Sequence, residues 1–293
     1  MIIVVRQQAQ ISNRLVALSA LMAHCLRHRI KLLILSLGDY QDILEPQPAN
    51  PLVRTIFLPA RLHQLTVRLL NSRLIQLLSR WIGLRSLDRQ RAWSEIAPAL
   101  LRSRIWLING SGDWCRTMPA IEAEQAPAIR RLLSFRSPFH QKAAAISQQL
   151  RQDCDVLIGV HARRGDYASH RNGCWFYNEE DYLRWIHQAP SLFPAIDANR
   201  IGFVVCSNDG GFLASCQGKA IAISPMGSAA GDQLLLSHCD LILGPPSTFS
   251  VWAAFLTDTR LLHIFRSDQN LQASQIRRST LFYAWQPNRE DDA

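Results

Sequence analysis

The chain has 293 residues, 48% of them apolar, which is enough for one large α/β domain or for two smaller ones. Its formal charge is +9, and all but three of its 32 lysines and arginines are arginine. This balance fits nucleic acid, an anionic membrane or a phosphorylated substrate. No apolar run is long enough to span a membrane, and the seven cysteines show neither a disulfide framework nor a Cys-x-x-Cys zinc pattern.

The N-terminal part alternates short strands with helices. An apolar strand at 2–5 opens the chain where a secretory signal would show basic residues, so we expect a cytoplasmic protein. The patterns that follow are a helix at 12–28, strands at 31–36 and 53–58, a helical stretch at 61–101, a strand at 105–109, and helices at 121–133 and 138–152.

The C-terminal part contains five brief aliphatic runs separated by helical patterns or loops, as in a buried parallel sheet. The runs are 156–161, 201–206, 220–224, 241–244 and 261–265. We therefore predict a doubly wound parallel sheet from about 152 to 270, with halves at 1–151 and 152–293.

The first strand of this sheet ends in the polar cluster His161, Arg163, Arg164 and Asp166. The carboxyl ends of strands line the ligand crevice in open α/β sheets, and side chains alternate between the two faces. One arginine is thus expected to bind a ligand phosphate while the other is held by Asp166 or by packing. The alternative is a surface loop with an Arg–Asp ion pair.

Two further segments follow strands at the same predicted edge. After Gly244-Pro-Pro, a helix opens at Ser247 or Thr248, where free backbone N–H groups form an anion site; Ser247 is equally well explained as an N-cap. The segment Ser207-Asn-Asp-Gly suits either contacts with a ribose or base, or a plain turn.

Some expected motifs are absent. Neither a Gly-x-Gly-x-x-Gly nor a P-loop pattern is present, which argues against dinucleotide oxidoreductases and P-loop enzymes. The single Asp-x-Asp, at 153–155, precedes a strand and so lies at the wrong end of the sheet for the site. We therefore predict no metal.

Three segments resemble a known family. His161-Ala-Arg-Arg-Gly-Asp-Tyr167 is similar to the His-x-Arg-Arg-Gly-Asp-Tyr signature of α-1,2-fucosyltransferases (glycosyltransferase family eleven) and their α-1,6- and protein O-fucosyltransferase relatives. Segment 232–240 resembles the family's Asp-x-x-x-(Met/Leu)-Ser-x-Cys-Asp, and 247–254 resembles Ser-Ser-Phe-Ser-Trp-Trp-Ala-Ala. A fainter likeness to Gly-x-Gly-Asn-Gln-Leu at 10–15 keeps Asn13 but has Arg14 in place of glutamine.

The resemblance implies a GT-B-like fold, with two Rossmann-like halves facing a cleft and an acceptor-side N-terminal half. It implies an inverting, metal-independent transfer of fucose from GDP-fucose to a glycan, without a cofactor. Arg163, which would bind the donor β-phosphate, His161 and Asp166 are the expected catalytic residues, and Asn13 and Arg14 are expected on the acceptor side. The expected donor-binding residues are Arg164, Ser207, Asn208, Asp209, Asp232, Ser247, Thr248, Phe249 and Ser250.

Other functions remain open at this stage. The chain could use another nucleotide sugar, or be a non-catalytic module that binds sugar nucleotides or glycans. A nucleic-acid-binding role rests on charge alone, without a recognisable motif, and is not expected. For the catalytic base, Asp166, Glu179, Asp39 and Asp113 are equally open.

The segment 61–82 is amphipathic as a helix. Leucines from Leu70 to Leu78, with Trp81 and Ile82, fall on one face, and arginines including Arg61, Arg68, Arg73 and Arg80 fall on the other. Such a helix belongs either to the core of the N-terminal half or, peripherally, to the inner face of an anionic membrane with a lipid-linked glycan acceptor. The core interpretation is favoured.

Overall fold

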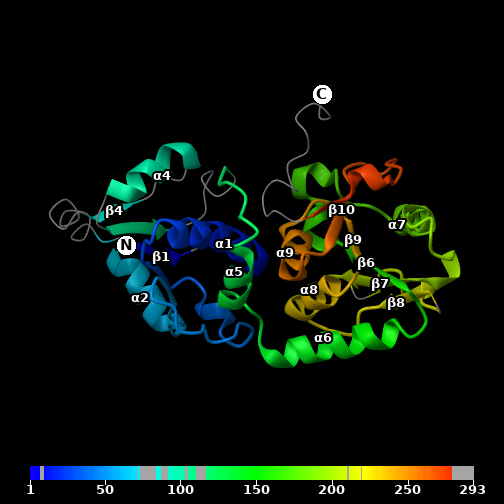
Figure 1. Cartoon of the computed structure of the whole chain (residues 1–293), viewed down its shortest axis with the longest axis horizontal. Helices are drawn as coiled ribbons and strands as arrows, with labels where there is room; N and C mark the ends of the chain where they lie inside the picture. The colour runs from blue at the N-terminus through cyan, green and yellow to red at the C-terminus, as the bar shows by residue number, and fades with distance from the viewer. Residues whose placement is uncertain are drawn as a thin grey trace. The chain divides into compact units, whose positions relative to one another are not determined.

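A computed structural model describes residues 1–6, 10–70, 72, 84–86, 92–102, 105–109, 117–209, 211–218 and 220–278. The chain divides into two compact units, Met1–Arg136 and Ser137–Ala293 (Figure 1), and each is described by itself. We expected the boundary after residue 151, just beyond the C-terminal end of helix α6 (Ser137–Leu150). The division into units falls instead at the N-terminal end of this helix. This helix belongs with the second unit because it packs against α8 (Ala229–Ser237).

The first unit contains a five-stranded sheet of order β3-β2-β1-β5-β4, in which all pairings are parallel. Its elements are β1 (Ile2–Arg6), α1 (Ile11–Arg27), β2 (Leu32–Ile34), β3 (Val53–Thr55), α2 (Ala60–Leu70), β4 (Leu84–Ser86), α4 (Trp93–Arg102), β5 (Ile105–Asn109) and α5 (Ala126–Leu132). The helical stretch expected at 61–101 is therefore wrong at β4. Three residues are too few to show a strand's alternation, and β4 is specified by its pairing with β5.

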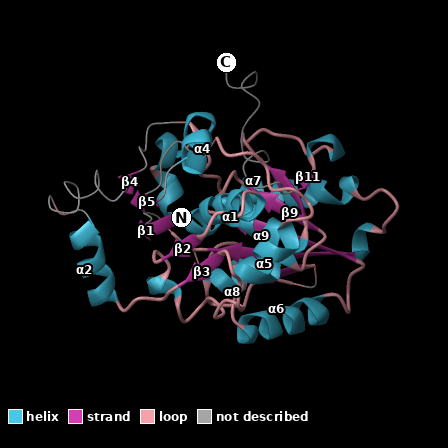
Figure 2. Cartoon of the chain, turned by 60° about the vertical axis from the view of Figure 1, so that its left-hand side comes forward, coloured by secondary structure: helices cyan, strands magenta, loops and turns pink. Residues whose placement is uncertain are grey.

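The second unit contains a six-stranded sheet of order β11-β10-β9-β6-β7-β8. Its remaining elements are β6 (Val156–Ala162), α7 (Glu179–Gln188), β7 (Ile201–Ser207), β8 (Ile221–Ile223), β9 (Leu241–Gly244), α9 (Thr248–Thr257), β10 (Arg260–His263) and β11 (Arg277–Arg278). Helices lie around the strands (Figure 2), and only the pairing of β11 is antiparallel among the described strands. The predicted α/β fold with a doubly wound parallel C-terminal sheet is confirmed.

All seven residues of β6 are buried, so the strand is covered on both faces. Val156, Ile158 and Val160 belong to an aromatic core that includes Tyr182 and Trp185 of α7. Gly159 points to the opposite face, where a Cβ atom would lie 2.6 Å from Cδ2 of Leu236 in α8. Alternate residues of β6 therefore face α7 on one side and α8 on the other.

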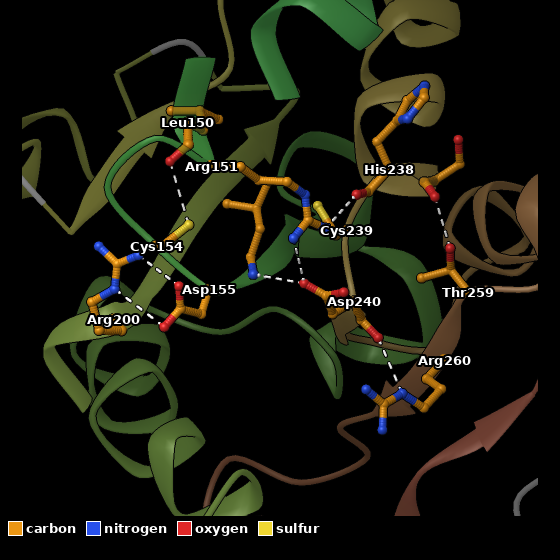
Figure 3. A network of polar contacts seen from close by, with 12 residues as sticks. Leu150, Arg151, Cys154, Asp155, Arg200, His238, Cys239, Asp240, Thr259 and Arg260 are labelled. Atoms are coloured by element: carbon orange, nitrogen blue, oxygen red, sulfur yellow. Dashed lines mark hydrogen bonds and ion pairs between the residues drawn. The ribbon is translucent and has the colours of Figure 1, made fainter. Parts of the chain in front are cut away.

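A network centred on Asp240 ties together the amino ends of three strands (Figure 3). The Asp240 carboxylate accepts a hydrogen bond of 2.8 Å from the Leu157 backbone N–H of β6 and pairs with Arg151 at 2.9 Å. Its backbone carbonyl accepts from Nε of Arg260 in β10 at 3.2 Å. Asp240 thus holds the amino end of β9 between its neighbouring strands, β6 and β10.

Candidate functional site

The site lies where the strand order reverses in the second unit. Numbered along the chain from β6, the parallel strands run 3-2-1-4-5 across the sheet, so the switch point falls between β6 and β9. Open α/β sheets bind ligands outside the carboxyl ends of the strands at such a point. The two strands approach closely there, since a Cβ on Gly244 would lie 2.4 Å from the His161 carbonyl oxygen.

Arg163 follows the carboxyl end of β6 and pairs with Asp166. Its Nη2 lies 2.9 Å from both carboxylate oxygens, while the Arg163 side chain is 13% exposed and that of Asp166 is 56% exposed. The guanidinium also lies over the Tyr167 ring, 5.5 Å from its centroid. Arg163 is thus a largely buried cation whose carboxylate partner opens to solvent.

Tyr167 joins Arg163 to the start of α9. Its hydroxyl donates a hydrogen bond of 2.6 Å to the Pro246 carbonyl and also interacts with Ser247. Burial raises the pKa of Tyr167, so the phenol stays protonated and remains a donor. The turn after β9 is therefore held beside Arg163, and Tyr167 is a site residue to which the sequence prediction gave no role.

The first turn of α9 begins with a side-chain cap. The Ser247 side chain is the N-cap and accepts from the Phe249 N–H at 3.2 Å. The Ser250 hydroxyl is fully buried and donates to the Ser247 carbonyl at 3.0 Å, so it lies inside the helix packing. Thr248 and Phe249 are half-buried at this edge. A helix start of this kind favours anions.

His161 is a buried, neutral imidazole. It stacks on the Phe249 ring at 4.7 Å between centroids. Burial, together with the positive charge of Arg163 and the neighbouring His263, lowers its pKa to about 3. His161 is therefore not protonated near neutral pH and cannot act as a general acid there. Its ring packs on Phe249 in the first turn of α9.

Arg164 makes contacts quite different from those of Arg163. Its guanidinium lies between the Phe176 and Phe212 rings, at 4.0 and 4.7 Å from their centroids, and donates to the Tyr177 carbonyl. The sequence prediction placed Arg164 on the donor; in the structure its guanidinium contacts the two rings and the Tyr177 carbonyl. The aromatic residues at 175–177, just after the motif, were the signal for this arrangement.

The turn after β7 uses two of its three polar side chains locally, while the third contacts the chain just after β6. Ser207 Oγ accepts from the Asp209 N–H at 3.1 Å, and Asp209 accepts from the Gly211 N–H at 3.3 Å. The side-chain oxygen of Asn208, Oδ1, accepts a hydrogen bond from the Arg164 backbone N–H at 2.7 Å. The Asn208 side chain is thus placed against the chain just after β6.

Asp232 lies in the first turn of α8. Its carboxylate accepts a 2.5 Å hydrogen bond from the Ser224 hydroxyl, which follows β8. Burial raises the pKa of Asp232, although the hydrogen bond from Ser224 acts in the opposite direction. The carboxylate is half-buried, and its residue contacts Cys206 at the end of β7.

In the first unit, Asn13 and Arg14 lie in the first turn of α1. Arg14 donates to the Ser36 carbonyl at 2.9 Å, lies 3.4 Å from Asp39, and covers the Tyr40 ring. Asn13 is exposed. These residues therefore gather at the carboxyl edge of β1 and β2.

The four candidate bases have different environments. Asp39 is exposed beside Arg14, and Asp166 is paired with Arg163. Glu179, at the start of α7, accepts from the Leu213 backbone N–H at 2.9 Å. Asp113 lies outside the described residues.

Two parallel α/β units, with a cationic switch-point site in the second, define a GT-B-like protein. The family model for glycosyl transferase family 11 matches residues 128–285, which is more than half of the sequence. The chain belongs to this family, as its three motifs suggested.

Relatives of known sequence match over a shorter stretch. The chain is 34% identical over 111 residues to galactoside α-(1,2)-fucosyltransferase 2 of Gorilla gorilla gorilla and of Hylobates lar. This match covers 35% of the chain and 31% of each relative, so the chain spans about a third of their length.

Solved structures share the fold over most of the chain. NodZ α-1,6-fucosyltransferase soaked with GDP-fucose is 19% identical, with a TM-score of 0.61 covering 94% of this chain and 98% of NodZ. A variant of Arabidopsis thaliana FUT1 in complex with GDP is 13% identical, with a TM-score of 0.62 covering 94% and 73%. At these identities the likeness establishes the GT-B-type fold.

Proposed function

We propose that the protein transfers fucose from GDP-fucose to a glycan hydroxyl with inversion at the anomeric carbon. The observation that carries this proposal is the convergence of Arg163 and the α9 N-terminus on Tyr167. Membership of glycosyl transferase family 11 supports it, as does the fold shared with NodZ, which was soaked with GDP-fucose.

The geometry suits a departing diphosphate. In the proposed reaction an acceptor oxygen attacks the anomeric carbon, the bond from that carbon to the β-phosphate oxygen breaks, and a base takes the acceptor proton. The Arg163 guanidinium and the N–H groups at the start of α9 would stabilise the charge that develops on GDP. Asp232, Ser207 and Asp209, at the same edge, would border the nucleoside.

We propose that this transfer needs no metal, because Arg163 and the helix dipole supply the positive charge that the diphosphate requires. Asp155 of the single Asp-x-Asp lies at the opposite edge, where both of its oxygens bind Arg200 at 3.2 and 2.6 Å. Within the described residues, no cluster of three or more His, Cys, Asp or Glu side chains could hold a metal ion.

Donor preference and metal dependence can be measured together. We expect GDP to raise the melting temperature while UDP and CMP do not, and EDTA to change neither this shift nor fucose release from GDP-fucose. A ligand at 100 times its Kd adds about 2.7 kcal/mol of stability. Stabilisation by UDP alone would favour another donor, GDP binding without turnover would favour a binding module, and manganese-dependent activity would contradict metal independence.

We further propose a cytoplasmic location with peripheral contact to an anionic membrane, where a lipid-linked glycan would be the acceptor. The observation is an exposed stripe on α2 consisting of Leu62, Leu65 and Leu69, which are 52%, 52% and 63% exposed. Arg61 and Arg68 are exposed on the helix beside it. Most of the apolar face expected at 70–82 lies outside the described residues, and Leu70 is half-buried.

The opposite side of α2 is anchored to the unit, since Nε2 of His63 lies 2.7 Å from the Val5 carbonyl oxygen. The leucines therefore point away from the sheet, as a helix lying in a membrane surface requires. Within the described parts of the chain, no helix is long and apolar enough to cross a bilayer.

We expect the protein to sediment with phosphatidylglycerol vesicles and not with phosphatidylcholine vesicles. Arg61→Gln with Arg68→Gln should weaken sedimentation, since each arginine near the surface contributes about 1 kcal/mol. Arg131→Gln with Arg266→Gln removes the same charge from exposed positions elsewhere and is the control. Equal sedimentation of the two double variants, or of Leu65→Ser and wild type, would exclude α2 as the contact.

A further inference from the structure

The segment between β6 and α7 carries Arg163, Asp166 and Tyr167 but has little regular structure. Its helical parts are two short 3-10 turns, Gly165–Ala168 and His170–Gly173. A segment that lacks the regular backbone hydrogen bonds of a strand or helix is held mainly by its side-chain contacts. The orientation of the Arg163 side chain therefore depends on the contacts that fix this segment.

Strand alternation sends the two arginines to opposite faces of the sheet. Val156, Ile158 and Val160 face the aromatic core beneath α7, and Arg164 continues this row toward Phe176 and Phe212. Residues 159 and 161 face α8 and α9, and Arg163 continues that row. The direction of Arg163 is thus tied to the placement of Arg164.

Arg164 contacts two parts of the chain at once. Its guanidinium donates to the Tyr177 carbonyl and stacks on Phe176 at the far end of the segment, while Phe212 comes from the β7–β8 connection. A planar guanidinium can stack between two rings and donate in its own plane, which an ammonium group cannot do.

Asn208 fixes the backbone at the same point. Its side-chain oxygen accepts from the Arg164 N–H at 2.7 Å. The next residue, Gly165, has a φ of +49°, and a Cβ there would lie 2.6 Å from Nδ2 of Asn208. The Asn208 carboxamide therefore packs directly on the turn that leads from Arg164 to Asp166.

We propose that Arg164 and Asn208 are positioning residues, which clamp segment 163–178 to the β7–β8 connection so that Arg163 is aimed at the donor diphosphate. The inference rests on the proposed function for its ligand. It reassigns both residues from donor contact to control of Arg163, with Phe176 and Phe212 as the two rings of the clamp.

The ratio of GDP to GMP affinity tests this role, because the clamp acts through the β-phosphate that GMP lacks. By calorimetry, Arg164→Lys should weaken GDP binding about tenfold and change GMP binding less than about twofold. Phe176→Leu, which keeps the charge, should act in the same direction. Arg184→Lys, at an arginine that covers Trp185 on α7, is the matched control and should leave both affinities unchanged.

Equal losses of affinity for GDP and GMP would show a direct nucleoside contact or general damage to the fold. Unchanged affinities would show that Arg164 does not position Arg163. Either result overturns the proposal. Hydrogen exchange of the free protein gives a second test that needs no ligand. Amides of 163–178 should exchange faster in Arg164→Lys and Asn208→Ala than in Arg184→Lys. Unaltered exchange would contradict the clamp even if wild type binds neither nucleotide, a result that would separately refute the proposed donor.

Discussion

Replacement of Arg163 by alanine is expected to lower GDP affinity and fucose transfer by about 100- to 1,000-fold while the protein stays folded. The substitution removes the largely buried cation at the switch point and leaves the Asp166 carboxylate to repel the diphosphate. Arg163→Lys should also be poor, because the bidentate fork is lost. Calorimetric titration with GDP and a transfer assay measure the loss.

The fold should tolerate this change, since the carboxylate that is left behind, Asp166, is exposed and can be hydrated once its partner is removed. Arg200→Ala removes an arginine paired with Asp155 at the opposite edge of the same sheet and is the matched control for charge. Wild-type GDP affinity in Arg163→Ala, or an equal loss in Arg200→Ala, would show that Arg163 does not bind the donor.

The second large effect is expected on stability. Asp240→Ala should lower the free energy of unfolding by about 2 to 3 kcal/mol, because it removes the acceptor for the Leu157 N–H and leaves Arg151 without its carboxylate. The carboxylate is half-buried, which places the expected cost below that of a fully buried pair. Urea unfolding monitored by circular dichroism measures the difference.

Asp155→Ala is the comparison for this variant, since Asp155 also pairs with an arginine at the amino edge of the sheet. Both partners are exposed there, so the loss should be clearly smaller than in Asp240→Ala. Similar losses of unfolding free energy in the two variants would mean that the amino ends of the strands do not depend on the Asp240 network.

The C-terminal sheet could be predicted from the sequence because its signals are local. Buried parallel strands appear as continuous aliphatic runs, and polar residues directly after them mark the carboxyl edge. The contacts of Arg164 could be predicted only in part, since the aromatic residues at 175–177 are near in sequence but Phe212 returns only after α7 and β7. The burial of Ser250 likewise follows from which face of α9 meets the sheet.

The N-terminal unit was harder to predict because its elements are short or depend on pairing. Three-residue strands such as β4 carry too little pattern to be separated from a helix, and their position is set by the neighbouring strand. In the same way, α6 could have belonged to either half until its packing against α8 was known.

Gly159, in the middle of β6, has no side chain where Leu236 and Cys239 of the α8 side approach. A larger residue at 159 would displace the side chains of Leu236 and Cys239. Asp232 lies on the same helix as Leu236, so we expect such a residue to disturb the packing of the helix that carries this carboxylate without touching any ligand. Among homologues, we expect position 159 to be restricted to very small residues. The cause would be the packing of the helix that borders the site, and not contact with the ligand.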